Sequence, residues 1–265
     1  MGCALISADL EICKGKTFEQ VFAWESDQVV YKPITGISKS APPVISCPDH
    51  GLVQNWRGAI ASVKGMTQIN ADNSPPKDKD YHVVTPMGDD AFSIPINALS
   101  FGTYSGSGTL IYNLPVDIDG FTARMSIKDK STPNSGQTAN LWQASIVIAE
   151  GKFAVIADGT ILEATTGGTT DVTEPTGAGT DGTVVWAVVE SFTGSTELLR
   201  LTTENDGIVI DNTYKTITVT ISAADTAALA FRKGVYDLEM VSGDATPVVT
   251  ALAAGKILVS EEVTT

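Results

Sequence analysis

The sequence predicts an all-β fold: a β-sandwich with two small inserted β modules and one short helix. Apolar residues recur at every second position rather than at the three- and four-residue spacing of an amphipathic helix. The segments between these alternating runs are rich in Gly, Asn, Asp and Pro, which favour turns. Together, the alternation and the turn residues indicate many short strands.

The clearest strand is predicted at Tyr214–Ile221, where apolar residues alternate with threonines. We expect one face of this strand to be buried and the other exposed. Ser222 follows it and precedes Asp225 by three residues, a spacing typical of a helix N-terminus, so a helix of about two turns is expected. The other strands predicted for the sandwich are Thr17–Trp24, Val29–Pro33, Phe121–Lys128, Leu198–Thr202, Gly207–Ile210, Gly234–Val241 and Ala254–Ser260.

Two stretches interrupt this series of strands. Between Pro33 and Phe121, prolines and a Gly-Ser-rich run separate short apolar segments, which indicates a small separate β unit. Between Lys130 and Phe192 the composition changes again, and Thr165–Gly182 predicts a long polar loop. Insertions are tolerated best at exposed loop tips. The predicted domains are a discontinuous sandwich (residues 1–37, 114–130 and 191–265), an inserted β-barrel (38–113) and an inserted module framed by tryptophans (131–190).

Composition and charge exclude several classes of function. The chain has 265 residues and a formal charge of −14, whereas binding to phosphate backbones needs clustered cations, so no nucleic acid partner is expected. No apolar run reaches the roughly 18 residues of a membrane span, and residues 1–10 lack the features of a signal peptide. Ile6 stands where the myristoylation motif has Ser or Thr. We expect synthesis in a cytoplasm, without Sec export or membrane insertion.

The three cysteines, Cys3, Cys13 and Cys47, do not have the spacing of a metal site, and we expect free thiols. The alternative is an intersubunit disulfide through Cys3, formed after release into an oxidising medium. We expect no metal and no cofactor.

Titratable residues do not form a recognisable catalytic group in the sequence. His50, in the run Asp49-His50-Gly51-Leu52, is expected to cap a turn, and His82 is expected to have a structural role in a strand. Hydrolysis needs an activated nucleophile or two acids with separated pKa values, and neither stands out. No catalytic residue and no enzyme activity are predicted. Four acids are expected to be exposed turn residues, the alternative being a calcium site: Asp78, Asp80, Asp89 and Asp90.

Aromatic residues supply the candidate contacts. Trp142 and Trp186 frame the second insertion and are expected to form its small core, the alternative being a platform for a glycan. Trp56, beside Arg57 in a Gly-flanked stretch, is a candidate exposed contact.

The predicted sandwich resembles a known family. Its strands, turns and short helix follow the order found in the Ig-like sandwich of tail and baseplate proteins of tailed bacteriophages, and the resemblance covers about 120 residues. It implies an Ig-like fold that docks to neighbouring subunits. The segments that carry it are Asp9–Ile12, Lys14–Phe18, Phe22–Trp24, Gly120–Lys128, Leu201–Ile208, Ile217–Ile221, Ser222–Leu229 and Gly234–Met240.

Both insertions also resemble modules of phage tail proteins. Asp49–Leu52, Gly65–Asn70 and Phe101–Thr109 resemble the small β-barrel named after the first catalytic-cysteine half-domain of ubiquitin-activating enzymes, which implies a scaffold and no chemistry. The segment from Leu141 to Trp186 resembles a module repeated in phage tail fibres, itself similar to chitin-binding carbohydrate modules. It departs from that pattern where aliphatic Ile161 and Leu162 replace an aromatic residue.

Taken together, these resemblances imply a structural virion protein, at the tail or baseplate or at the attachment of a tail fibre. Its partners would be other tail or baseplate proteins and further copies of itself around the tail axis. Two alternatives remain open: a receptor-binding module for a host-surface polysaccharide, and a neck, collar or capsid fibre. These expectations rest on likeness of fold.

Overall fold

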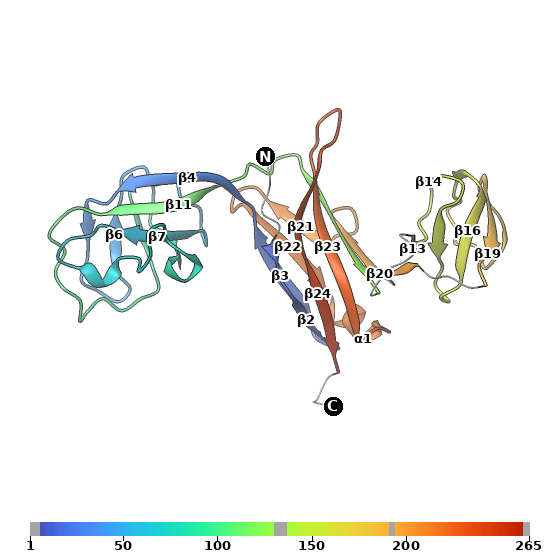
Figure 1. The fold of residues 1–265 in the computed structure, drawn as a ribbon, viewed down its shortest axis with the longest axis horizontal. Helices are drawn as coiled ribbons and strands as arrows, with labels where there is room; N and C mark the ends of the chain where they lie inside the picture. Colours follow the sequence, from blue (N-terminus) through green and yellow to red (C-terminus); the bar gives the residue numbers. More distant parts are fainter. Residues whose placement is uncertain (1–5, 130–136, 191–193, 262–265) are drawn as a thin grey trace. The chain divides into compact units, whose positions relative to one another are not determined.

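The computed structural model describes residues 6–129, 137–190 and 194–261, and Figure 1 shows its elements. Nearly all regular structure in these residues is β-strand, with one α-helix, α1 (Ala223–Ala228), and two 3-10 turns, η1 (Thr67–Ile69) and η2 (Asp78–Asp80). The all-β class predicted from alternation is therefore confirmed.

The largest sheet has a mainly antiparallel centre. β12 pairs with both β20 and β23, and β23 pairs with β24, all antiparallel. The short strands β1 and β2 both lie parallel to β24, and β13 lies parallel to β20. The order is β1 (Ile6–Ser7), β24 (Val249–Ser260), β23 (Lys233–Val241), β12 (Thr122–Lys128), β20 (Ser195–Thr202), β13 (Thr138–Leu141), β15 (Phe153–Val155), β16 (Ile161–Thr166), β19 (Val184–Val188) and β18 (Gly179–Asp181), with β2 (Leu10–Cys13) beside β24.

Strand alternation gives the central strands of this sheet a buried face and an open face. Along β12, Ala123, Met125 and Ile127 are buried, as Tyr236 and Leu238 are along β23. Burying side chains of this size stabilises the fold by about 1.5–3 kcal/mol each, Ala123 less. The residues between them point to the opposite face and are mostly charged or polar.

A second, three-stranded sheet has the order β21 (Ile208–Asp211), β22 (Thr216–Ile221) and β3 (Phe18–Ala23). Ile217, Val219 and Ile221 of β22 are buried and the intervening threonines are partly exposed, as the alternation predicted. The short helix is confirmed as well: the Ser222 hydroxyl accepts a hydrogen bond from the backbone N–H of Asp225.

Two four-stranded sheets surround the core formed between residues 34 and 112. One has the order β4 (Glu25–Pro33), β11 (Thr109–Pro115), β7 (Arg57–Ala61) and β8 (His82–Val83); the other has β5 (Gly36–Ile37), β6 (Val44–Ser46), β10 (Ala91–Ser93) and β9 (Thr85–Pro86). Their buried cluster includes Ile45, Trp56, Ile60, Phe92 and Tyr112.

The segment that follows β13 has its own small core. Leu162, Val184 and Trp186 are buried in it, and the short strands β14 (Val147–Ile148) and β17 (Gly168–Thr169) pair beside it. The expected long loop at Thr165–Gly182 is wrong, because the stretch contains β17, β18 and the end of β16. The backbone N–H of Thr183 donates to the carbonyl of Thr169, a contact that the Thr- and Gly-rich composition did not reveal.

Contacts divide the chain into two compact units, each discontinuous in sequence. One comprises Met1–Gln20, Gly120–Val209 and Val219–Thr265, and the other comprises Val21–Asp119 and Ile210–Thr218. The three-part division drawn from the sequence, and the Ig-like character of the sandwich, stay predictions.

Candidate functional site

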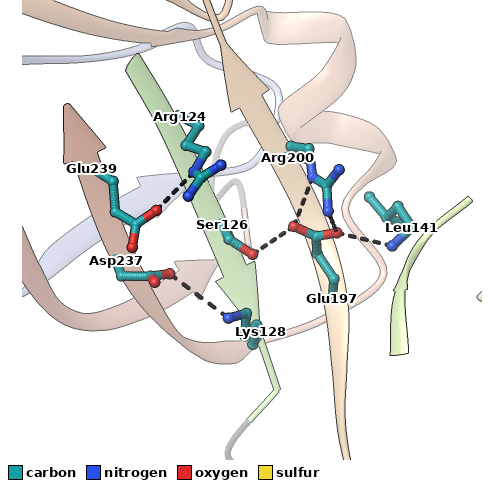
Figure 2. A network of polar contacts seen from close by, with 8 residues as sticks. All are labelled: Arg124, Ser126, Lys128, Leu141, Glu197, Arg200, Asp237 and Glu239. Atoms are coloured by element: carbon teal, nitrogen blue, oxygen red, sulfur yellow. Dashed lines mark hydrogen bonds and ion pairs between the residues drawn. The ribbon is translucent and has the colours of Figure 1, made fainter. Parts of the chain in front are cut away.

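The open face of β12 carries Arg124, Ser126 and Lys128, which project toward residues of β20 and β23 (Figure 2). Arg124 lies directly opposite Glu239 in the strand register, and its Nε donates to Glu239 Oε2 at 2.7 Å. Lys128 Nζ lies 4.0 Å from Asp237 Oδ1. Exposed ion pairs of this kind contribute at most about 1 kcal/mol each to stability. Their main effect is to cancel charge on this face of the sheet.

The centre of the network is the carboxylate of Glu197, whose side chain is completely buried. Its Oε1 accepts hydrogen bonds from Ser126 Oγ at 2.5 Å and Arg200 Nε at 3.0 Å. Its Oε2 accepts from Arg200 Nη2 at 2.6 Å and from the backbone N–H of Leu141 at 2.9 Å. A buried charge is tolerated when it is paired and its oxygens are satisfied, and Glu197 meets both conditions.

Glu197 thereby joins three strands: β12 through Ser126, β20 through its own backbone, and β13 through Leu141 (Figure 2). The register between β13 and β20 holds only two residue pairs, Thr138 with Ser195 and Ala139 with Thr196. The bond to Leu141 lies beyond those pairs. Glu197 therefore extends a short parallel pairing by a side-chain hydrogen bond.

Beside this network lies a groove of about 660 Å³ on the open face of β12, β20 and β23. A second hollow of about 370 Å³ adjoins it and is lined by residues around Trp142 and Phe153. The two share Asn140, Gln143 and Arg200, and all of these residues lie in one compact unit. We refer to the two together as the β12 groove.

The structure places Trp56 in the core between residues 34 and 112, where it is 2% exposed. Its Nε1 donates to the carbonyl of Asn113 at 2.9 Å. The expectation that Trp56 is an exposed contact is wrong, because its indole, directly before β7, packs among the apolar side chains of this core and its N–H is satisfied there. No surface remains on it for a partner.

Arg57 points outward but is used within the chain. Its Nη2 donates to Glu25 Oε2 at 2.8 Å, its Nε donates to Glu25 Oε1, and its Nη1 donates to Asp78 at 3.1 Å. The guanidinium carbon also lies 4.9 Å from the centre of the Tyr81 ring. These contacts, first the hydrogen bond with Glu25, raise the pKa of Arg57 above its ordinary value.

Trp142 and Trp186 donate their indole N–H groups to one acceptor, Oδ2 of the buried Asp181, at 2.8 and 3.0 Å. Asp181 Oδ1 accepts from the backbone N–H of Asp171 at 2.6 Å. Trp186 is 2% exposed and belongs to the core, whereas Trp142 is half-buried and packs against it. This arrangement favours the core role for both rings, and Trp186 offers no open face for a platform.

The two histidines lie in different environments. His50 is buried: its Nδ1 accepts from the N–H of Leu52, and its Nε2 lies 3.0 Å from the carbonyls of Gly88 and Ala91. Carbonyls only accept, so Nε2 carries the proton and His50 holds two turns together, as expected. His82 is half-buried, and desolvation lowers its pKa.

Only one of the four acids considered for calcium is buried. Asp80 accepts from the N–H groups of Lys77 and Asp72 and from the Asn73 amide, which makes it a turn acceptor. The expectation that it is exposed is wrong, because these three donors replace water. Asp78, Asp89 and Asp90 are exposed. Among the residues that the structure describes, no cluster of three His, Cys, Asp or Glu side chains is arranged to hold a metal ion.

Cys13 is exposed and Cys47 is buried, and both are free thiols. Burial raises the pKa of the Cys47 thiol to about 11, so it stays protonated and unreactive near neutral pH. Cys3, the candidate for an intersubunit disulfide, lies outside the described residues.

Sequence reasoning missed Glu197, Asp181 and the ion pairs of the open face. The alternation in Phe121–Lys128 places Arg124, Ser126 and Lys128 on the polar face of the strand. The residues that this strand contributes to the network can therefore be recognised in the sequence. Their partners stand more than 70 residues away, and a shift of register beside Lys128 decides that Glu197 meets this strand. A local sequence pattern does not predict such a shift of register.

Replacing Glu197 by glutamine tests the junction. The Glu197→Gln variant loses the charge that Arg200 neutralises and one of its acceptor oxygens, so the backbone amide of Leu141 should exchange with deuterium at least about tenfold faster. Hydrogen exchange with mass spectrometry measures this. Glu239→Gln, which removes an exposed pair on the same face, is the control and should leave Leu141 protected. Equal protection in all three proteins would contradict the role of Glu197.

Replacing Asp181 tests the core around Trp186. Asp181→Ala leaves two indole N–H groups without their acceptor, at a cost of about 1–3 kcal/mol for each unsatisfied donor, and Asp181→Asn should cost less. Exchange protection of β16 and β19 should fall accordingly. Asp171→Ala, an exposed neighbour, should change it little. Retained protection in Asp181→Ala would show that the indoles do not depend on this carboxylate.

Comparison with known proteins supplies no relative from which to transfer a role. No protein-family model matches the chain, and no curated protein matches it. In the part of the chain that the structure describes, no helix is long and apolar enough to cross a membrane.

Proposed function

We propose that the chain is a non-catalytic structural subunit of a tailed-bacteriophage virion, at the tail or baseplate or at the attachment of a tail fibre. It acts by docking to neighbouring subunits. The resemblance of its strand order and insertions to tail proteins supports the assignment to a virion, and one surface of the large sheet supports the docking.

That surface is a hollow of about 570 Å³ over β2, β24 and β23. Val235 and Leu258 are 36% and 46% exposed there, on the open side of the sheet. Two lysines, Lys233 and Lys256, and two acids, Asp9 and Glu11, line the hollow beside them. Neither lysine forms an ion pair with the residues that the structure describes. Apolar side chains bordered by both cations and carboxylates suit a partner surface that is apolar and carries charges of both signs.

Copies of this chain are such partners, since each carries the same apolar hollow bordered by two lysines and two acids. Repetition around a tail axis would bring many of these contacts together, so that weak individual contacts add up to firm attachment. The same hollow would serve other tail or baseplate proteins with a matching surface. In this proposal the subunits assemble in the bacterial cytoplasm, with no role for nucleic acid or membrane.

Replacing Leu258 by aspartate tests the docking surface. Leu258→Asp places a negative charge among the apolar side chains, so self-association of the full chain should weaken at least about tenfold. Light scattering after size-exclusion chromatography, over a series of concentrations, measures it. Val209→Asp, an exposed residue of β21, is the matched control and should leave association unchanged. A monomeric wild-type chain would contradict self-docking through this surface.

The second part of the proposal, the position of the chain in the phage particle, is tested by electron microscopy. Antibody against this chain, visualised by immunogold electron microscopy on intact phage particles, should label the distal tail. Label at the neck or head would instead favour a collar or capsid fibre, and unlabelled particles together with a monomeric chain would count against a virion role.

A further inference from the structure

β4 is an edge strand: among the residues that the structure describes, it pairs with β11 on one side and with no strand on the other. It has nine residues, whereas the other edge strands of the described sheets have two to six. A free edge presents a row of unpaired N–H and C=O groups, which can pair with a further strand. β4 is therefore the longest free edge in the described part of the chain.

The register with β11 shows which main-chain groups of β4 point away from that neighbour. Directly after β4, the backbone N–H of Ile34 donates to the carbonyl of Gly108 at 3.0 Å. In an antiparallel pair the direction of the main-chain groups alternates from one residue to the next. Residues in phase with Ile34 therefore face β11, whereas Val29 and Tyr31, which are out of phase with it, direct their N–H and C=O groups to the free edge.

The side chains of these two residues are open to solvent. Val29 is 40% exposed and Tyr31 is 64% exposed, whereas Val30 between them is half-buried and packs against the core of this unit. The outer face of β4 thus places two apolar side chains next to the free main-chain groups. A strand added at this edge would cover both of them.

β4 complements itself when two copies meet in antiparallel orientation about a two-fold axis at Val30. Val29 of each copy then lies opposite Tyr31 of the other, and each such pair exchanges both of its N–H···O bonds. A β-branched residue opposite an aromatic residue is a favourable cross-strand pair. A register centred on Val29 would instead place Asp27 opposite Tyr31, which leaves the ring without an apolar partner.

Local charge does not oppose this pairing, although each copy carries a formal charge of −14. Glu25 is neutralised by Arg57, and the other charged residues of β4 are one acid, Asp27, and one cation, Lys32. In the register centred on Val30, Lys32 lies opposite Gln28, so no like charges face each other across the two strands. Repulsion between the remaining surface charges is screened by salt.

We infer that β4 pairs in antiparallel orientation with β4 of a second copy, with Val29 opposite Tyr31. The four-stranded sheet that contains β4 and β11 then continues from one copy into the other. This inference goes beyond the docking proposed above, because β4 belongs to a different compact unit from the hollow over β24. It holds whether or not the chain belongs to a virion.

Disulfide trapping tests the register. Gln28 of one copy and Lys32 of the other form a non-hydrogen-bonded pair, whose Cα atoms are about 4.5 Å apart, within the roughly 4.4–6.8 Å that a disulfide spans. The samples are two variants of the full chain, Gln28→Cys and Lys32→Cys, each in a background with Cys3→Ser and Cys13→Ser. Mixed under mild oxidation, they should form a crosslinked dimer at least about tenfold faster than either variant alone. Non-reducing electrophoresis and mass spectrometry of the joined peptides measure this.

Three further substitutions, each made in both members of the mixture, separate the possible contacts. Val29→Lys places a cation at the free edge and should slow crosslinking at least about tenfold. Val83→Lys is the matched control, because Val83 is an exposed valine of β8, the opposite edge strand of the same sheet, and it should leave the rate unchanged. Leu258→Asp should also leave it unchanged, since it weakens only association through the hollow over β24.

Two results would overturn the inference. One is crosslinking that is no faster in the mixture than in the single variants. The other is a rate that falls with Leu258→Asp but not with Val29→Lys, because the copies would then meet only through the hollow over β24. Loss of association in Leu258→Asp, with crosslinking through β4 retained, would support both surfaces separately.

Discussion

A single carboxylate, that of Glu197, is the constraint on which the region around the large sheet depends. Its buried oxygens must each find donors, and they find them on β12, β20 and β13. Removing Arg200 would leave the buried carboxylate without its counter-charge, which typically costs about 3–5 kcal/mol. The network therefore selects the one arrangement of the three strands in which every partner is present, and the β12 groove is a consequence of that arrangement.

Asp181 is a second buried carboxylate that accepts hydrogen bonds from several segments, in the smaller core around Trp186. Two tryptophans from opposite ends of the segment, together with the backbone of Asp171, converge on its two oxygens. Apolar contacts among so few residues do not by themselves fix one arrangement of the side chains in the core. Directional hydrogen bonds to Asp181 help to fix it. The exposed ion pairs of the open face do something different. They contribute little stability but leave that face nearly neutral.

Patterns that act locally were predictable from the sequence. The alternation in β22 and the Ser222 cap depend on neighbours within four residues, and both were predicted correctly. The interior position of Trp56 and the pairing of β17 with β14 were not predicted, because they depend on register and on contacts distant in sequence. The burial of Glu197 was not predicted for the same reason. A charged residue in a half-exposed strand is ordinarily solvated, whereas Glu197 contacts Ser126 after the shift of register near Lys128 and is also held by Arg200 and Leu141.

The most direct test of this account is to measure interstrand nuclear Overhauser effects between β13 and β20 in the full wild-type chain. A fixed junction at Glu197 predicts backbone contacts linking Thr138 with Ser195 and Ala139 with Thr196, and the same rotational correlation time for β16 as for β12. Absence of those contacts, with faster reorientation of the segment around Trp186, would contradict a fixed junction at Glu197 and with it the groove built upon that junction.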